Sequence, residues 1–104
     1  MLEIKTLDEY RKTIKDNSKT IIDFYADWCG PCKAIAPAFK ELAQKNPEIL
    51  FCKVNVDEAE EVAADLKIQS LPTISFYHNG TVSDQLIGLN LPSLTEKVAK
   101  LKTL

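Results

Sequence analysis

The chain has 104 residues, about the length of one compact domain, and its 45% apolar and 27% charged residues are typical of a globular protein. Its 13 Lys and Arg residues against 15 Asp and Glu residues give a net charge of −2. The chain therefore lacks the basic excess that binding to nucleic acid or to an anionic membrane draws on. These residues have no room for a second catalytic domain, and we expect a single domain over residues 1–104.

No segment is apolar for long enough to cross a membrane, because the longest apolar run is Ile49 to Cys52, against the roughly 20 residues of a spanning helix. The first ten residues alternate charged and apolar side chains, which is untypical of a signal or transit peptide. The three cysteines are too few and too unevenly spaced for a secreted disulfide framework. We therefore expect a cytoplasmic protein whose cysteines serve chemistry.

Strands and helices are predicted to alternate at the start of the chain. Residues 2–5 form a short alternating strand, and Thr6 and Glu9 have the spacing of a capping box ahead of apolar residues at helical spacing. Residues 20–25 are a β-branched and aromatic run, which is typical of a strand buried on both faces, as in a parallel sheet. A pair of cysteines follows this strand directly.

The alternation continues through the middle of the chain. From Cys29 to Lys45 the apolar residues keep helical spacing across Pro37, which predicts one helix that is kinked at the proline. A third strand is expected over residues 50–56 and a short acidic helix over residues 58–66. The order to this point is βαβαβα.

The last third of the chain predicts a hairpin and a helix. The strand-like residues 73–78 and 81–87 flank an Asn-Gly pair, which is the strongest short hairpin signal in the chain. Asn90 can cap a last helix that extends to Leu101. The sheet is therefore expected to become antiparallel at this end.

The chemistry of the chain is predicted to lie in the Cys29-x-x-Cys32 pair. Residues with this spacing share one face of the first turn of a helix, near backbone N–H groups that have no helical partner. A thiolate there can attack a partner disulfide, and a second thiol within reach can resolve the mixed disulfide. We therefore expect Cys29 to be the nucleophile and Cys32 the resolving thiol.

A zinc site is the alternative interpretation of this pair, because two such cysteines are half of a four-ligand set. The other good ligands, Cys52 and His78, fall on separate predicted strands and lack the usual paired spacing. We therefore expect no metal, and Cys52 is interpreted as a small buried apolar residue.

The motif Trp28-Cys-Gly-Pro-Cys32 after the strand at 21–25 resembles the active site of the thioredoxin family. This resemblance implies an α/β fold, the thioredoxin fold, with a central five-stranded mixed sheet flanked by four helices. It also implies that no cofactor is bound, since the electrons reside on the two cysteines. The resemblance covers essentially the whole chain and continues through Lys33, Ile35-Ala36-Pro37, Lys53-Val54-Asn55-Val56-Asp57, Leu71-Pro72-Thr73, Asn79-Gly80 and Gly88.

Asp23 lies among apolar neighbours in its predicted strand, where an unpaired carboxylate is costly to bury. A surface position at a strand end is the alternative. The resemblance implies a buried proton acceptor for Cys32, with Lys53 of the adjacent strand as the partner of Asp23. Burial raises a carboxyl pKa by up to ~3 to 5, more than the ~1 to 3 by which a cation lowers it, so we expect Asp23 to exchange protons near neutral pH.

A weakly apolar docking surface is expected around an exposed Cys29. The resemblance implies a cis peptide bond before Pro72, facing the disulfide, with the Leu71 backbone free to pair with an extended substrate segment. Trp28 alone could fill the core, but beside this cysteine we expect a half-exposed wall. The expected substrate-binding residues are Trp28, Gly30, Pro31, Leu71, Pro72, Ile87 and Gly88.

Two further side chains near the site have undecided partners. Asp57 either begins a solvated helix or accepts a hydrogen bond from the indole N–H of Trp28. Tyr25 departs from the family pattern, which more often has Trp or Phe there, and its hydroxyl needs a partner or water.

Three functions are consistent with these features. The first is a monomeric protein-disulfide reductase, recharged by an NADPH-dependent thioredoxin reductase, that transports electrons and maintains cell redox homeostasis. The second is an oxidant or isomerase of a secretory compartment, but such relatives usually carry a thiolate-stabilising His between the cysteines, which Gly30-Pro31 lacks. The third is a binding module that uses the same surface. We expect the first.

Overall fold

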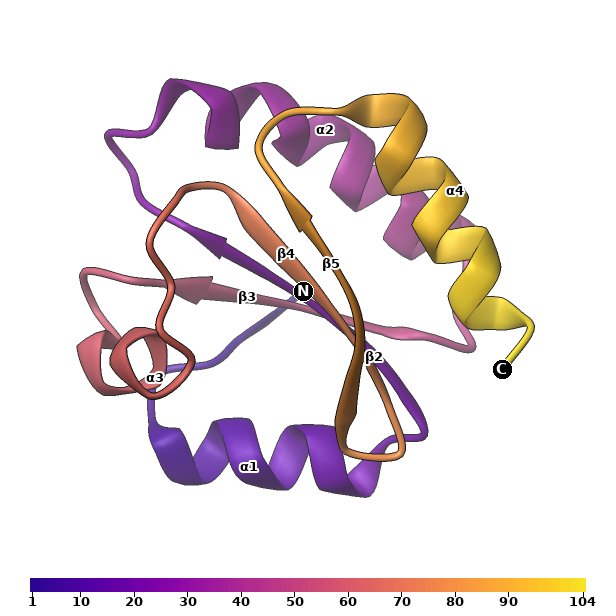
Figure 1. Ribbon diagram of the computed structural model, residues 1–104, viewed down its shortest axis with the longest axis horizontal. Coiled ribbons are helices and arrows are strands. Elements are labelled where there is room, and N and C mark those ends of the chain that lie inside the picture. Colours follow the sequence, from indigo (N-terminus) through magenta and orange to yellow (C-terminus); the bar gives the residue numbers. More distant parts are fainter.

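The computed structural model describes all residues 1–104. Five strands form one mixed sheet, and four helices pack against it (Figure 1). The strand order in the sheet is β1-β3-β2-β4-β5. The elements are β1 (Leu2–Glu3), α1 (Leu7–Asp16), β2 (Lys19–Tyr25), α2 (Gly30–Lys45), β3 (Leu50–Asn55), α3 (Glu60–Asp65), β4 (Thr73–His78), β5 (Thr81–Ile87) and α4 (Leu91–Lys102).

The central strand β2 joins the parallel and antiparallel halves of the sheet. It pairs in parallel with β3, which also holds β1, and it pairs antiparallel with β4, which holds β5. Asn79 and Gly80 connect β4 to β5 with φ values of 52° and 82°, the left-handed values that a two-residue hairpin turn requires. The predicted five-stranded mixed sheet with four helices is confirmed.

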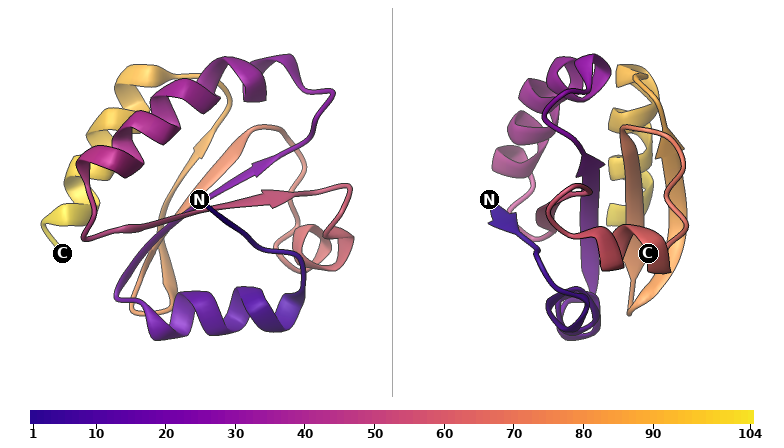
Figure 2. Two further views of the ribbon diagram at one scale, coloured as in Figure 1. Left: turned by 180° about the vertical axis from the view of Figure 1, so that it is seen from behind. Right: turned by 90° about the vertical axis from the view of Figure 1, so that its left-hand side faces the viewer.

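Each face of the sheet is covered by two helices. The face under α2 and α4 buries Ile21, Phe39 and Leu94, and the face under α1 and α3 buries Ile22 and Val62. In Figure 2, α2 and α4 lie on one side of the sheet, and α1 and α3 lie on the other. Because successive residues of β2 enter opposite cores, the strand is apolar on both faces, as its sequence predicts.

Several element ends differ from their predicted positions. The third helix begins at Glu60 instead of residue 58, because the backbone N–H groups of Glu58 and Ala59 both donate to the Asn55 carbonyl and form a turn first. That turn also ends β3 at Asn55, one residue early. The first strand ends at Glu3 instead of Lys5. The Ile4 N–H still donates to the Lys53 carbonyl, but the chain then turns into the N-cap of α1 at Thr6.

The cysteine pair is placed by the connection between β2 and α2. Cys29 is the N-cap of α2, and the helix continues without interruption through Pro37 to Lys45. Because β2 is the central strand, its carboxyl end delivers the motif to the middle of one edge of the sheet. No helix of the chain is both long enough and apolar enough to cross a membrane.

Candidate functional site

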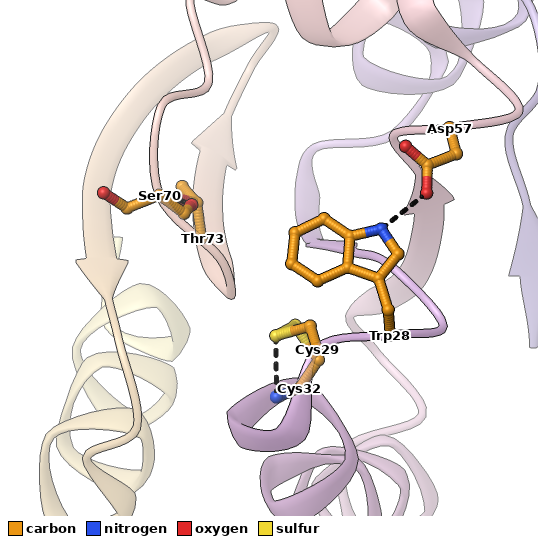
Figure 3. The surroundings of a disulfide bond; sticks show 6 residues. All are labelled: Trp28, Cys29, Cys32, Asp57, Ser70 and Thr73. Atoms are coloured by element: carbon orange, nitrogen blue, oxygen red, sulfur yellow. Dashed lines mark hydrogen bonds between the residues drawn. A yellow bond between two sulfur atoms is a disulfide. The ribbon is translucent and has the colours of Figure 1, made fainter.

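Cys29 and Cys32 form a disulfide across the first turn of α2, with their Cα atoms 5.3 Å apart (Figure 3). The backbone N–H of Cys32 donates a hydrogen bond to the Cys29 sulfur over 3.2 Å. A tight turn before the helix sets this geometry, since the Cys29 N–H donates to the Ala26 carbonyl. The positive end of the helix dipole and this N–H both favour negative charge on the Cys29 sulfur.

The two cysteines are less exposed than the sequence predicts. Each is only 4% exposed in the disulfide form, because both pack in a small cluster with Ala26, against Val56 and Leu71. The expectation of an exposed Cys29 is therefore wrong for this form. The two cysteines are equally exposed, but Cys29 lines a shallow depression in the surface and Cys32 does not.

Trp28 stands beside the disulfide and is more exposed than predicted. Its side chain is 71% exposed, where a half-exposed wall was expected. The indole N–H donates a 2.9 Å hydrogen bond to Asp57 (Figure 3). This bond decides between the two alternatives for Asp57, and it holds the ring at the rim of the depression.

The loop before β4 lies across the site from Trp28, and its Leu71–Pro72 peptide bond is cis, as predicted. Pro72 itself is buried, and its carbonyl accepts a 2.9 Å hydrogen bond from the Gly88 N–H. Ile87 is 62% exposed next to this contact. Pro72 thus lies under the surface, whereas Leu71 is partly buried and Ile87 is accessible.

The expected docking residues are only partly brought together. Leu71 lines the depression together with Trp28, whereas Pro72, Ile87 and Gly88 do not line it. Ile68 and Gln69 line it too and were missed, although their position just before the Leu-Pro pair could have indicated them. The lining residues of the depression are Trp28, Cys29, Gly30, Pro31, Val56, Ile68, Gln69 and Leu71.

Asp23 is buried on the sheet face that α2 covers, and it is only 3% exposed. Its Oδ1 atom is buried without a hydrogen-bond partner. Burial, the largest cause, raises the pKa of Asp23 to about 7, while the charge of Lys53 lowers it and that of Glu3 raises it. The predicted direction and its dominant cause are confirmed.

Lys53 pairs with Asp23 in the ladder between β3 and β2, but its ammonium does not form an ion pair with that carboxylate. Instead, the ammonium lies 4.7 Å from the ring centroid of Tyr25, in a cation–π contact. The predicted partner Lys53 therefore acts on Asp23 only through its charge, without direct contact between the ammonium and the carboxylate.

The hydroxyl of Tyr25 has a partner that the sequence did not indicate. It donates a 2.8 Å hydrogen bond to the Glu3 carboxylate. Burial, and secondarily this carboxylate, raise the pKa of Tyr25, so the phenol keeps its proton and acts as a donor. Only strand pairing reveals Glu3, because β1 is a two-residue strand with no local signal of function.

The third cysteine has no part in this site. Cys52 is fully buried in β3, and burial raises the pKa of its thiol to about 12. It therefore stays protonated at neutral pH, as expected of a small apolar residue. No group of three or more His, Cys, Asp or Glu side chains in the chain is arranged to hold a metal ion.

Comparison with known proteins identifies a family. The thioredoxin family model matches residues 2–100. The chain is 45% identical over 101 residues to thioredoxin-like protein 1 of Schizosaccharomyces pombe, covering 95% of this chain and 35% of that protein. It is 43% identical over 102 residues to thioredoxin of Geodia cydonium, covering 95% and 96%. The solved structure of Plasmodium falciparum thioredoxin superposes with a TM-score of 0.93 at 38% identity, covering 96% and 98%.

Proposed function

Because the chain belongs to the thioredoxin family, we propose a role for each residue of its site. The chain is a thiol-disulfide oxidoreductase of the protein-disulfide reductase type, and it needs no bound cofactor. Its electrons are carried by the Cys29–Cys32 pair. The observation that carries the assignment of roles is the position of the two cysteines, since Cys29 lines the surface depression and Cys32 does not.

In the proposed reaction, the Cys29 thiolate attacks one sulfur of a substrate disulfide. A mixed disulfide forms, and the other substrate sulfur leaves as a thiolate that takes up a proton from water. Cys32 then loses its proton to Asp23 and attacks the Cys29 sulfur, which closes the intramolecular disulfide. The second substrate sulfur leaves as a thiolate and takes up a proton from water. Two electrons have moved from the chain to the substrate.

The role of Asp23 is supported by its burial under the helix that carries Cys32. A carboxylate whose Oδ1 atom has no partner gains from receiving a proton, because the neutral form is cheaper to bury. With a pKa of about 7, raised mainly by that burial, it can accept a proton and return it to solvent near neutral pH. Lys53 acts on Asp23 by charge alone, and its charge lowers this pKa.

Substrate docking is proposed around the depression. An extended substrate segment that pairs with the Leu71 backbone, as a short added strand, would bring its disulfide to Cys29. Trp28 supplies the opposite wall and is oriented by Asp57. The proposed docking residues are Trp28, Gly30, Pro31, Leu71, Pro72, Ile87 and Gly88.

Removing the orienting hydrogen bond should weaken docking without stopping the chemistry. Asp57→Ala leaves the indole N–H of Trp28 unpaired, at a cost of about 1 kcal/mol for an exposed bond of this kind. We expect KM for a protein disulfide to rise by a few fold while kcat changes little. Steady-state kinetics would measure both, with Glu58→Ala as a neighbouring control. A fall in kcat with an unchanged KM would contradict an orienting role.

Disulfide proteins are the partners that the family supports. One solved relative, 34% identical, is described in connection with the thiol-resolving mechanism of a yeast mitochondrial 1-Cys peroxiredoxin. We propose that an NADPH-dependent thioredoxin reductase recharges this chain and that residues 1–104 act as one monomeric domain. A reducing compartment such as the cytoplasm suits the pair, since the Gly-Pro spacer adds no charge that would favour an oxidant.

An insulin-reduction assay with NADPH and a thioredoxin reductase tests this function directly. We expect NADPH to be consumed in proportion to the concentration of the chain. The double variant Cys29→Ser with Cys32→Ser should be inactive, whereas a pure binding module would have no such requirement. A wild-type chain that neither reduces insulin nor accepts electrons from the reductase would contradict the proposal.

A further inference from the structure

Three charged side chains lie side by side across β1, β3 and β2, and one aromatic residue contacts two of them. Glu3 pairs in register with Lys53, and Lys53 pairs in register with Asp23. Directly paired residues point to the same face of a sheet, which here is the face covered by α2. All three line one open groove beside that helix.

Tyr25 contacts two of these three charges, Glu3 and Lys53. It lies two residues after Asp23 on β2, so it shares the same face. Its hydroxyl donates a 2.8 Å hydrogen bond to the Glu3 carboxylate, and the Lys53 ammonium lies 4.7 Å from the centroid of its ring. The second Glu3 oxygen is buried and has no partner, so the hydroxyl of Tyr25 is what holds this carboxylate.

The charges around Asp23 are few and come from three elements. Glu3 on β1 is the nearby anion, and Lys53 on β3 is the nearby cation. Lys40 of α2 and the terminal residue Met1 also line the groove. On the other side, β4 presents the uncharged Ile74 opposite Asp23. Glu3 therefore acts on Asp23 with little competition from other anions.

We propose that Glu3 and Tyr25 are positioning residues for the proton acceptor. Tyr25 holds the Glu3 carboxylate by a hydrogen bond from its hydroxyl and holds the Lys53 ammonium by a cation–π contact with its ring. The two opposite charges near Asp23 are therefore fixed in position. The negative charge of Glu3 makes Asp23 hold its proton more tightly. The cation–π contact with Tyr25 prevents Lys53 from forming an ion pair with Asp23 that would cancel this effect of Glu3. This inference rests on the proposed role of Asp23.

The variant Glu3→Gln isolates the charge of Glu3. The amide oxygen can still accept from Tyr25, so the hydrogen bond and the packing are retained. Loss of a like charge at this range should lower the midpoint of the Asp23 titration, on the order of half a pH unit to one unit. The titration is followed by ¹³C NMR of the Asp23 carboxyl carbon in the oxidised protein.

The matched control is Glu96→Gln, which removes the same charge from an exposed position on α4. Its Asp23 midpoint should coincide with that of wild type. A Glu3→Gln midpoint that also coincides with wild type would overturn the inference, because a merely structural Glu3 would not move it.

Tyr25 is tested by repeating the Glu3 substitution in the Tyr25→Phe background. Without the Tyr25 hydroxyl, the Glu3 carboxylate is no longer held in place. Glu3→Gln should therefore shift the Asp23 midpoint by less than half of the shift that it causes when Tyr25 is present. Equal shifts in the two backgrounds would show that Tyr25 does not position Glu3.

A rate measurement separates this inference from the proposed function. Asp23→Asn should remove the pH dependence of substrate reduction that is assigned to Asp23 in wild type. If it leaves that dependence unchanged, the proposed role of Asp23 fails, yet the NMR titrations still decide whether Glu3 and Tyr25 control the carboxyl group.

Discussion

Replacing Cys29 by Ser should abolish disulfide reduction, whereas replacing Cys32 by Ser should permit one attack and then stop the cycle. The first variant lacks the thiol of the cysteine that lines the depression. The second retains it but cannot resolve the mixed disulfide, which therefore accumulates. We expect turnover to fall at least about 10³-fold in both variants, since covalent catalysis is lost or blocked. Mass spectrometry after incubation with a disulfide protein distinguishes them by the adduct mass.

The control for this experiment is Cys52→Ala, which removes the buried third thiol and should leave turnover intact. In the Cys32→Ser variant, the adduct should map to Cys29. If the Cys29→Ser variant formed adducts on Cys32 at the rate at which the Cys32→Ser variant forms them on Cys29, the two roles would be reversed.

Replacing Asp23 by Asn should make the protein more stable at pH 8 and slower as a reductase. Burial raises the pKa of this carboxyl from 3.8 to about 7, so between those values the folded chain binds a proton that the unfolded chain has lost. Stability therefore falls as pH rises through this window and levels off above it. The difference in pKa corresponds to a penalty on the order of 4 kcal/mol at pH 8.

Part of that penalty is already present at pH 5, so the advantage of Asp23→Asn should grow by about 2 to 3 kcal/mol between pH 5 and pH 8. Urea titrations at the two pH values measure this change. Asp16→Asn, on the exposed end of α1, should alter stability equally at both. An advantage that is the same at pH 5 and pH 8 would show that the Asp23 pKa is not raised.

The same Asp23→Asn variant should slow substrate reduction by up to about 10²-fold near neutral pH, because the proton of Cys32 loses its acceptor. Stopped-flow mixing of the reduced chain with a disulfide substrate would measure this step. A gain in stability together with an unchanged rate would leave Asp23 as a buried carboxyl without a role in proton transfer.

Local sequence determined the order of the elements and the redox pair. The hairpin depends on an Asn-Gly pair, the capping of α1 depends on Thr6 and Glu9, and the cysteine pair lies within one helical turn. Each of these signals spans only a few residues, so it can be recognised without knowing what packs against it. The buried state of Asp23 was predictable for a similar reason, because its immediate neighbours are apolar on both sides.

Tertiary structure decided which side chains face one another. Glu3 meets the hydroxyl of Tyr25 only because β1 pairs with β3 and β3 with β2. Lys53 stands on an aromatic ring and does not form an ion pair with Asp23, a choice between two nearby partners that no sequence spacing encodes. The low exposure of Cys29 likewise depends on packing against Val56 and Leu71 from distant segments. Such contacts depend on strand register and side-chain direction, and these are set by the assembled sheet.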